Sequence, residues 1–159
     1  MVNKYILDID VEKCNACMRC VFACSLARNG VIDERQSMIR IIVDKGIVID
    51  IAVCRHCDPA PCVNVCEFVA LRVEDGRIVL DQSKCTTCKA CISVCPFGAI
   101  RESYGGKLVK CDLCDGDPAC VRVCPTGAIK YIPAHFVKTR RTSSVTKKIY
   151  EYVEKIGMR

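Results

Sequence analysis

Short runs of apolar, β-branched residues, separated by turn-forming residues, are the most regular pattern along this chain. Residues 37–43 and 47–53 are two such runs, and the glycine-containing turn between them predicts a β-hairpin. A second hairpin is predicted over 69–73 and 77–81, and a third on either side of Gly105-Gly106. No apolar run approaches the ~18 residues that a membrane span needs.

From about residue 136 the pattern changes to that of an amphipathic helix. Ser143 or Ser144 can cap it, and an apolar stripe follows at helical spacing: Val145, Ile149, Tyr152, Val153 and Ile156. The helix either packs on its own domain or docks onto a larger subunit, and a disordered tail is the third alternative. The sequence therefore predicts a body over residues 1–135 and a basic amphipathic tail over residues 136–159.

The charge is concentrated in this tail. Residues 136–159 hold seven basic and two acidic side chains, a net charge of +5, whereas the whole chain carries +6. Although a basic segment can bind nucleic acid, no aromatic interleaving or binding motif accompanies it, so docking to a protein is favoured. The first eight residues lack the apolar region of a signal peptide, which predicts a soluble, cytoplasmic protein.

All sixteen cysteines fall into four quartets. These are Cys14, Cys17, Cys20 and Cys24; Cys54, Cys57, Cys62 and Cys66; Cys85, Cys88, Cys91 and Cys95; and Cys111, Cys114, Cys120 and Cys124. Quartets one and three have the C-x₂-C-x₂-C-x₃-C spacing of bacterial iron–sulfur ligation, and quartets two and four only lengthen the middle interval. Sixteen thiolates in this arrangement predict four [4Fe–4S] clusters, which would add about −8 to the charge of the body.

Two other uses of these cysteines are disfavoured. Disulfides need an oxidising compartment, and structural zinc uses well-separated C-x₂-C pairs rather than triplets with a trailing fourth cysteine. Three cysteines of a quartet can wrap around one cluster, but the fourth, three residues further on, ligates the other cluster in two-cluster ferredoxins. The quartets are therefore expected to work in pairs.

An internal repeat follows the quartets. Residues 95–100 and 124–129 are near copies, Cys-Pro-x-Gly-Ala-Ile, and residues 66–71 are a degenerate third copy. Proline stops the short helix that presents the last cysteine, and glycine permits the tight turn after it. Quartet one lacks this ending, and its helix is expected to run on to Gly30.

Residues 5–132 resemble the four-cluster iron–sulfur electron-transfer subunits of molybdenum and tungsten oxidoreductases. This group contains the small subunits of formate dehydrogenase, dimethyl sulfoxide reductase and formate hydrogenlyase. The motifs that carry the resemblance are Cys54-Arg55-His56-Cys57-Asp58-Pro59-Ala60-Pro61-Cys62, Cys85-Thr86-Thr87-Cys88-Lys89-Ala90-Cys91, Lys110-Cys111-Asp112-Leu113-Cys114 and Pro118-Ala119-Cys120.

The resemblance implies that quartet one pairs with four and quartet two with three. Cluster one would be held by Cys14, Cys17, Cys20 and Cys124, and cluster two by Cys111, Cys114, Cys120 and Cys24. Cluster three would be held by Cys54, Cys57, Cys62 and Cys95, and cluster four by Cys85, Cys88, Cys91 and Cys66. The implied fold is α+β, with two tandem ferredoxin-like modules of two clusters each, short hairpins and a C-terminal helix.

The resemblance also implies a function. The chain would relay electrons between a catalytic tungsten or molybdenum pterin subunit and a ferredoxin or similar carrier. Its short length and basic tail make it most similar to the small subunits that accompany tungsten aldehyde:ferredoxin oxidoreductases in anaerobes. The alternatives are a free-standing polyferredoxin and an electron-transfer subunit of a formate dehydrogenase or hydrogenase complex. No catalytic residues are predicted, because no zinc-protease motif, dinucleotide fingerprint or spare cysteine supplies a substrate site.

His56 lies between two predicted ligands, Cys54 and Cys57. Because sixteen thiolates suffice for four clusters, His56 is not predicted to bind iron. It is expected either to donate a hydrogen bond to cluster sulfur or simply to be exposed to solvent.

Overall fold

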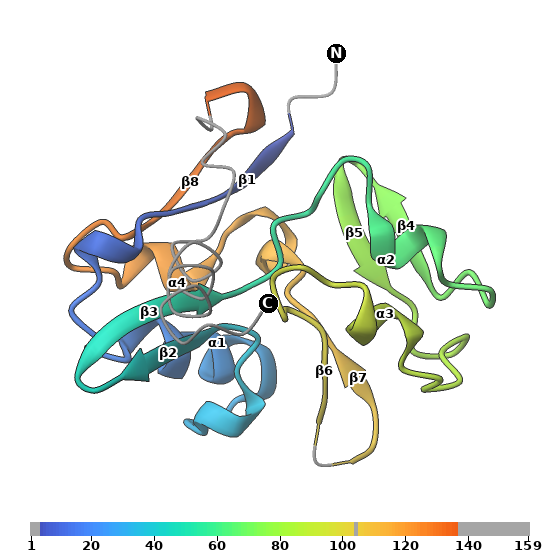
Figure 1. Ribbon diagram of the computed structural model, residues 1–159, viewed down its shortest axis with the longest axis horizontal. Helices are drawn as coiled ribbons and strands as arrows, with labels where there is room; N and C mark the ends of the chain where they lie inside the picture. The colour runs from blue at the N-terminus through green and yellow to red at the C-terminus, as the bar shows by residue number, and fades with distance from the viewer. Residues whose placement is uncertain (1–3, 104, 137–159) are drawn as a thin grey trace, which may run out of the picture.

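The fold is α+β and is made of short elements (Figure 1). The computed structural model describes residues 4–103 and 105–136. The strands are β1 (Tyr5–Ile9), β2 (Arg40–Asp44), β3 (Ile47–Ala52), β4 (Leu71–Glu74), β5 (Arg77–Leu80), β6 (Arg101–Glu102), β7 (Leu108–Val109) and β8 (Ile129–Pro133). The α-helices are α1 (Arg19–Asn29), α2 (Pro61–Asn64), α3 (Ala90–Ser93) and α4 (Ala119–Arg122), and the 3₁₀ helices are η1 (Val11–Lys13), η2 (Glu34–Gln36), η3 (Leu113–Gly116) and η4 (Ala134–Phe136).

The three predicted hairpins are confirmed. β2 pairs with β3, β4 with β5, and β6 with β7, each in antiparallel register. Each turn contains a glycine with positive φ, namely Gly46, Gly76 and Gly106, because a tight hairpin turn needs a left-handed residue that glycine adopts without steric cost. The predicted tail helix lies outside the described residues.

One sheet joins the two ends of the described chain, and it was not predicted. β1 pairs antiparallel with β8, so that Tyr5 lies opposite Pro133 and Ile9 opposite Ile129. The Asp10 N–H continues the ladder by donating to the Ala128 carbonyl over 2.8 Å. This sheet holds the segment before quartet one against the segment after quartet four.

The helix of quartet one is longer than those of the other quartets, as predicted. α1 runs for eleven residues and ends at Gly30, which has φ +69° and whose N–H donates to the Leu26 carbonyl. The other three α-helices in the described part of the chain have four residues each. Gly30 acts as the left-handed C-terminal cap that its position in the sequence indicates.

The elements form two lobes, each with its own core (Figure 1). The first lobe contains β1, α1, β2, β3, α4 and β8, and α1 packs on α4. The second lobe contains α2, β4, β5, α3, β6 and β7, and α2 packs on α3. The helices of quartets one and four therefore meet in one lobe, and those of quartets two and three meet in the other.

The repeat after the last cysteine of quartets two, three and four folds the same way each time. Val69, Gly98 and Gly127 stand at the same place in the repeat and have φ values of +51°, +54° and +65°. The next two residues of each copy are buried: Ala70 and Leu71, Ala99 and Ile100, and Ala128 and Ile129. Only the first copy puts a β-branched residue into the left-handed turn, where its side chain is 59% exposed.

Replacing Val69 with glycine should therefore stabilise the protein. A left-handed conformation costs a residue with a Cβ about 1–2 kcal/mol, and the greater flexibility of unfolded glycine offsets part of that gain. We expect a net gain of about 1 kcal/mol, which raises the thermal unfolding midpoint of the anaerobic, iron-loaded protein by about 2–4 °C. Val69→Ala is the matched control, because it retains the Cβ. An equal midpoint for the two variants would show that the turn is not strained.

Candidate metal centres

Each cysteine loop contains a left-handed residue at the same place. The residue immediately before the second cysteine of each quartet is Ala16, His56, Thr87 or Leu113, with φ values of +57°, +48°, +55° and +65°. Such residues are uncommon outside glycine and persist only where the surrounding structure imposes them. Turn conformations of this kind can direct successive backbone N–H groups to one side, and such concave arrangements bind anions, including those of iron–sulfur sites.

The third cysteine of every quartet is the second residue of an α-helix. Cys20, Cys62, Cys91 and Cys120 follow Arg19, Pro61, Ala90 and Ala119, the first residues of α1, α2, α3 and α4. All four of these cysteines are buried. Both cysteine spacings thus place the third cysteine at the same position in a helix. In quartets one and three a left-handed residue, Met18 or Lys89, directly precedes the helix. In quartets two and four the loop is longer and an extended residue precedes the helix.

The thiols of the first lobe form two groups. The pKa of the Cys20 thiol is raised to about 12 by burial first and then by the charges of three neighbouring thiols: Cys14, Cys124 and Cys17. The pKa of Cys120 is also raised, first by burial and then by the charges of three thiols: Cys111, Cys24 and Cys114. We call Cys14, Cys17, Cys20 and Cys124 group 1, and Cys24, Cys111, Cys114 and Cys120 group 2.

The remaining eight thiols form two further groups. The pKa of Cys62 is raised to about 11, first by burial and then by the charges of three thiols: Cys54, Cys95 and Cys57. The pKa of Cys91 is raised by burial and then by Cys85, Cys88 and Cys66. We call Cys54, Cys57, Cys62 and Cys95 group 3, and Cys66, Cys85, Cys88 and Cys91 group 4. All four thiols of group 4 line one apolar cavity, which Leu71, Leu80 and Leu108 help to enclose.

By these effects on one another's pKa the sixteen thiols fall into four sets of four, each with three cysteines of one quartet and the last cysteine of another. Group 2 lies next to two others, because the charge of Cys20 also raises the pKa of Cys120 and that of Cys54 raises the pKa of Cys111. Within the described residues, no three cysteine, histidine or acidic side chains are close enough together to hold one metal ion.

The groups differ in exposure. Cys17 in group 1 and Cys88 in group 4 are exposed, whereas every thiol of groups 2 and 3 is buried or partly buried. Backbone N–H groups also donate to some of the sulfurs: Met38 to Cys24 over 3.3 Å, Ala99 to Cys95 over 3.4 Å and Leu113 to Cys111 over 3.4 Å. Buried sulfur sites with N–H donors suit the four-thiolate ligation of a [4Fe–4S] cluster.

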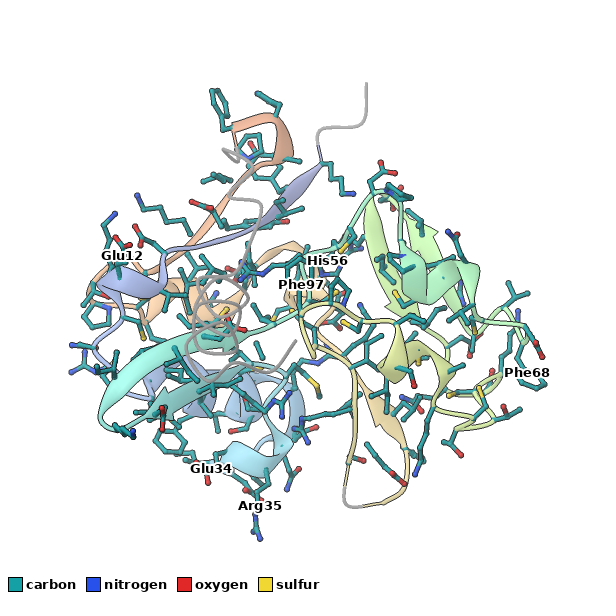
Figure 2. All side chains as sticks on the ribbon, in the orientation of Figure 1. Glu12, Glu34, Arg35, His56, Phe68 and Phe97 are labelled. Carbon is teal, nitrogen blue, oxygen red and sulfur yellow. The ribbon has the colours of Figure 1, made fainter. Side chains whose placement is uncertain are left out.

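His56 is not exposed, so that alternative was wrong. Its ring lies in the middle of the molecule, between the lobes (Figure 2), and is 1% exposed. Nδ1 accepts a hydrogen bond from the Ile78 N–H over 2.9 Å, and Nε2 is buried without a partner among the described residues. Burial, aided by the charge of Lys110, lowers the pKa of His56 to about 3, so the ring is neutral near pH 7. A histidine side chain that packs against a distant strand leaves no periodic signal in the sequence.

In the described part of the chain, no helix has both the length and the apolar character needed to cross a membrane.

Comparison with known proteins identifies the family. A family model described as a 4Fe-4S dicluster domain matches residues 45–133, more than half of the chain. The aliphatic sulfonate oxidoreductase, polyferredoxin-like subunit of Pyrococcus furiosus is 38% identical over 85 residues, which cover 52% of this chain and 49% of that protein. A tetrathionate reductase subunit of Archaeoglobus fulgidus is 35% identical over 90 residues, which cover 55% of this chain and 44% of that protein.

One more curated protein and one solved structure are similar to this chain. The electron transport protein HydN of Escherichia coli is 35% identical over 94 residues, which cover 55% of this chain and 53% of that protein. This chain thus spans about half the length of the curated relatives it matches. A chain of the active site complex BamBC of benzoyl coenzyme A reductase aligns with a TM-score of 0.49 and 21% identity, covering 94% of this chain and 90% of that one. Because the family model spans quartets two, three and four, the chain belongs to the 4Fe-4S dicluster domain family.

Proposed function

We propose that this chain is an electron-transfer subunit that carries four [4Fe–4S] clusters. The observation that carries the proposal is the grouping of its thiols into four sets of four. Groups 1 to 4 would hold clusters one to four, with every cysteine of a group as a ligand. Each bound cluster would supply reversible one-electron chemistry. The two lobes, with their separate cores, support two ferredoxin-like modules in the body over residues 1–135.

The order of the groups supports a relay. Group 2 lies next to group 1, because the charge of Cys20 raises the pKa of Cys120. It also lies next to group 3, because the charge of Cys54 raises the pKa of Cys111. Cys62 of group 3 and Cys91 of group 4 are both buried in the core of the second lobe. Electrons would therefore pass along the order one, two, three, four. The exposed Cys17 and Cys88 mark clusters one and four as the ends at which partners exchange electrons.

The proposed partners are a catalytic oxidoreductase subunit with a tungsten or molybdenum pterin, of the aldehyde oxidoreductase type, and a ferredoxin or similar carrier. Relatives whose names describe them as subunits of an aliphatic sulfonate oxidoreductase and of a tetrathionate reductase support the role of a subunit. The proposal gives this chain no substrate site of its own.

Anaerobic purification from the native source tests the proposal. A larger subunit containing tungsten or molybdenum should co-elute with this chain at a fixed ratio, and substrate should bleach the iron–sulfur absorption only when both subunits are present. Each subunit alone with the same substrate is the control. Elution of the chain by itself, with full activity as a diffusible carrier, would favour a free-standing polyferredoxin. Substrate turnover by the isolated chain would make it an enzyme.

A further inference from the structure

One residue of β5 links the two lobes. In the β4–β5 hairpin Ile78 lies opposite Val73, next to the hydrogen-bonded pair at the turn, so its N–H and C=O point away from β4. The Ile78 N–H donates to His56 Nδ1 over 2.9 Å, and the Ile78 carbonyl accepts from Lys110 Nζ. His56 belongs to the loop of quartet two, and Lys110 directly precedes quartet four. The edge of one strand thus connects the loops that hold groups 2 and 3.

The second ring nitrogen of His56, Nε2, is a hydrogen-bond donor without an acceptor among the described residues. Because Nδ1 accepts a hydrogen bond, the neutral ring carries its proton on Nε2. This N–H is buried and has no acceptor within the described residues. An orphaned buried donor in a folded protein indicates an acceptor that the described residues do not supply. Since His56 lies between Cys54 and Cys57, the sulfur of a cluster in group 3 is the acceptor that this position offers.

Lys110 leaves a charge unbalanced at the same place. Its side chain is 6% exposed, and two of its N–H groups donate to carbonyls, those of Ile78 and of Cys111. Within residues 4–103 and 105–136 no carboxylate pairs with this ammonium. Its charge lowers the pKa of Cys62 in group 3 and of Cys111 in group 2, although burial raises both by more. A buried cation needs nearby negative charge, and two anionic clusters would supply it.

We propose that His56 and Lys110 form a buried bridge on Ile78, in which His56 Nε2–H donates to a sulfur of cluster three and Lys110 holds its positive charge between clusters two and three. Reduction adds one negative charge to a cluster, so both groups stabilise the reduced form and raise its potential. The bridge would keep the two inner clusters reducible even though burial among apolar groups disfavours added charge. The inference rests on the four-cluster proposal, which the iron content of the unsubstituted protein tests separately.

His56→Asn isolates the unpaired donor. The Asn Oδ1 stands at the same number of bonds from Cβ as His Nδ1, so it can still accept from Ile78, and Asn tolerates the φ of +48° at this residue. The Nε2–H is lost, and the Asn amide N–H₂ stands at the place of ring Cδ2, one bond closer to Cβ than Nε2. EPR-monitored redox titration should show all four clusters, with one of the four potentials lowered. We expect about a tenfold change in its reduction equilibrium, which is 59 mV for one electron. Four unchanged potentials would overturn the assignment of His56.

Lys110→Met tests the charge, and Lys107→Met is its control, because Lys107 is an exposed lysine of the same segment. Lys110→Met should lower two potentials, Lys110→Arg should restore most of the change, and Lys107→Met should alter none. Equal effects of Lys110→Met and Lys107→Met would overturn the role of Lys110.

A measurement on the unsubstituted protein covers the case in which a variant does not keep its iron. The chain has two histidines, and His135→Gln removes the other one. With ¹⁵N-labelled histidine, pulsed EPR of the reduced protein should detect a nitrogen coupled to one cluster. No coupling would overturn the hydrogen bond.

Discussion

Replacing Cys24 with serine should damage the cluster on Cys111, Cys114 and Cys120 and leave the cluster on its own triplet intact. Cys24 is buried in α1 and shares group 2 with those three thiols, whereas Cys20, one helical turn earlier, shares group 1. Two thiols four residues apart on one helix therefore serve different sites. The control is Cys20→Ser, which should damage the cluster on Cys14, Cys17 and Cys124 instead.

Double variants show how many clusters are lost. If Cys24 and Cys111 ligate the same cluster, Cys24→Ser with Cys111→Ser should cost one cluster, about four of sixteen irons. Cys24→Ser with Cys17→Ser should cost two clusters, about eight irons. Iron analysis and EPR of the dithionite-reduced proteins measure both. Loss of two clusters in the first double variant would show that quartets one and four do not share ligands.

Removing the iron should unfold the chain. Seven of the sixteen cysteines are buried, and five of them lie in the core of the first lobe. Among the described residues, three of the four α-helices have four residues and each sheet has two strands, so these elements have little stability of their own. Binding of the metal is therefore coupled to folding. After iron removal under argon in the presence of a thiol reductant, far-ultraviolet circular dichroism should fall to that of an unfolded chain.

The same treatment without the chelator is the control for this experiment, and readdition of iron and sulfide should restore the spectrum. An iron-free chain that kept its secondary structure and unfolded cooperatively would show that the organic core suffices.

Local patterns predicted much of the fold, whereas the grouping of the thiols was expected only from the family resemblance, because the spacing alone does not say which quartets pair. The hairpins and the end of α1 at Gly30 follow from apolar alternation and glycine placement, which act over a few residues. The β1–β8 sheet pairs segments more than a hundred residues apart, and no local signal selects its register. The left-handed Val69 contradicts its own β-branched preference, so only its place in the repeat hints at the turn. Buried His56 is hydrogen-bonded to Ile78, which comes from another segment of the chain.

Iron and acid-labile sulfide analysis of the anaerobically produced, full-length protein tests the central claim most directly. Four [4Fe–4S] clusters require about sixteen irons and sixteen sulfides per chain, and spectroscopy of the reduced protein should account for all of them as cubane clusters. A content that stops near eight irons after reconstitution, or stoichiometric zinc in place of iron, would contradict the four-cluster account.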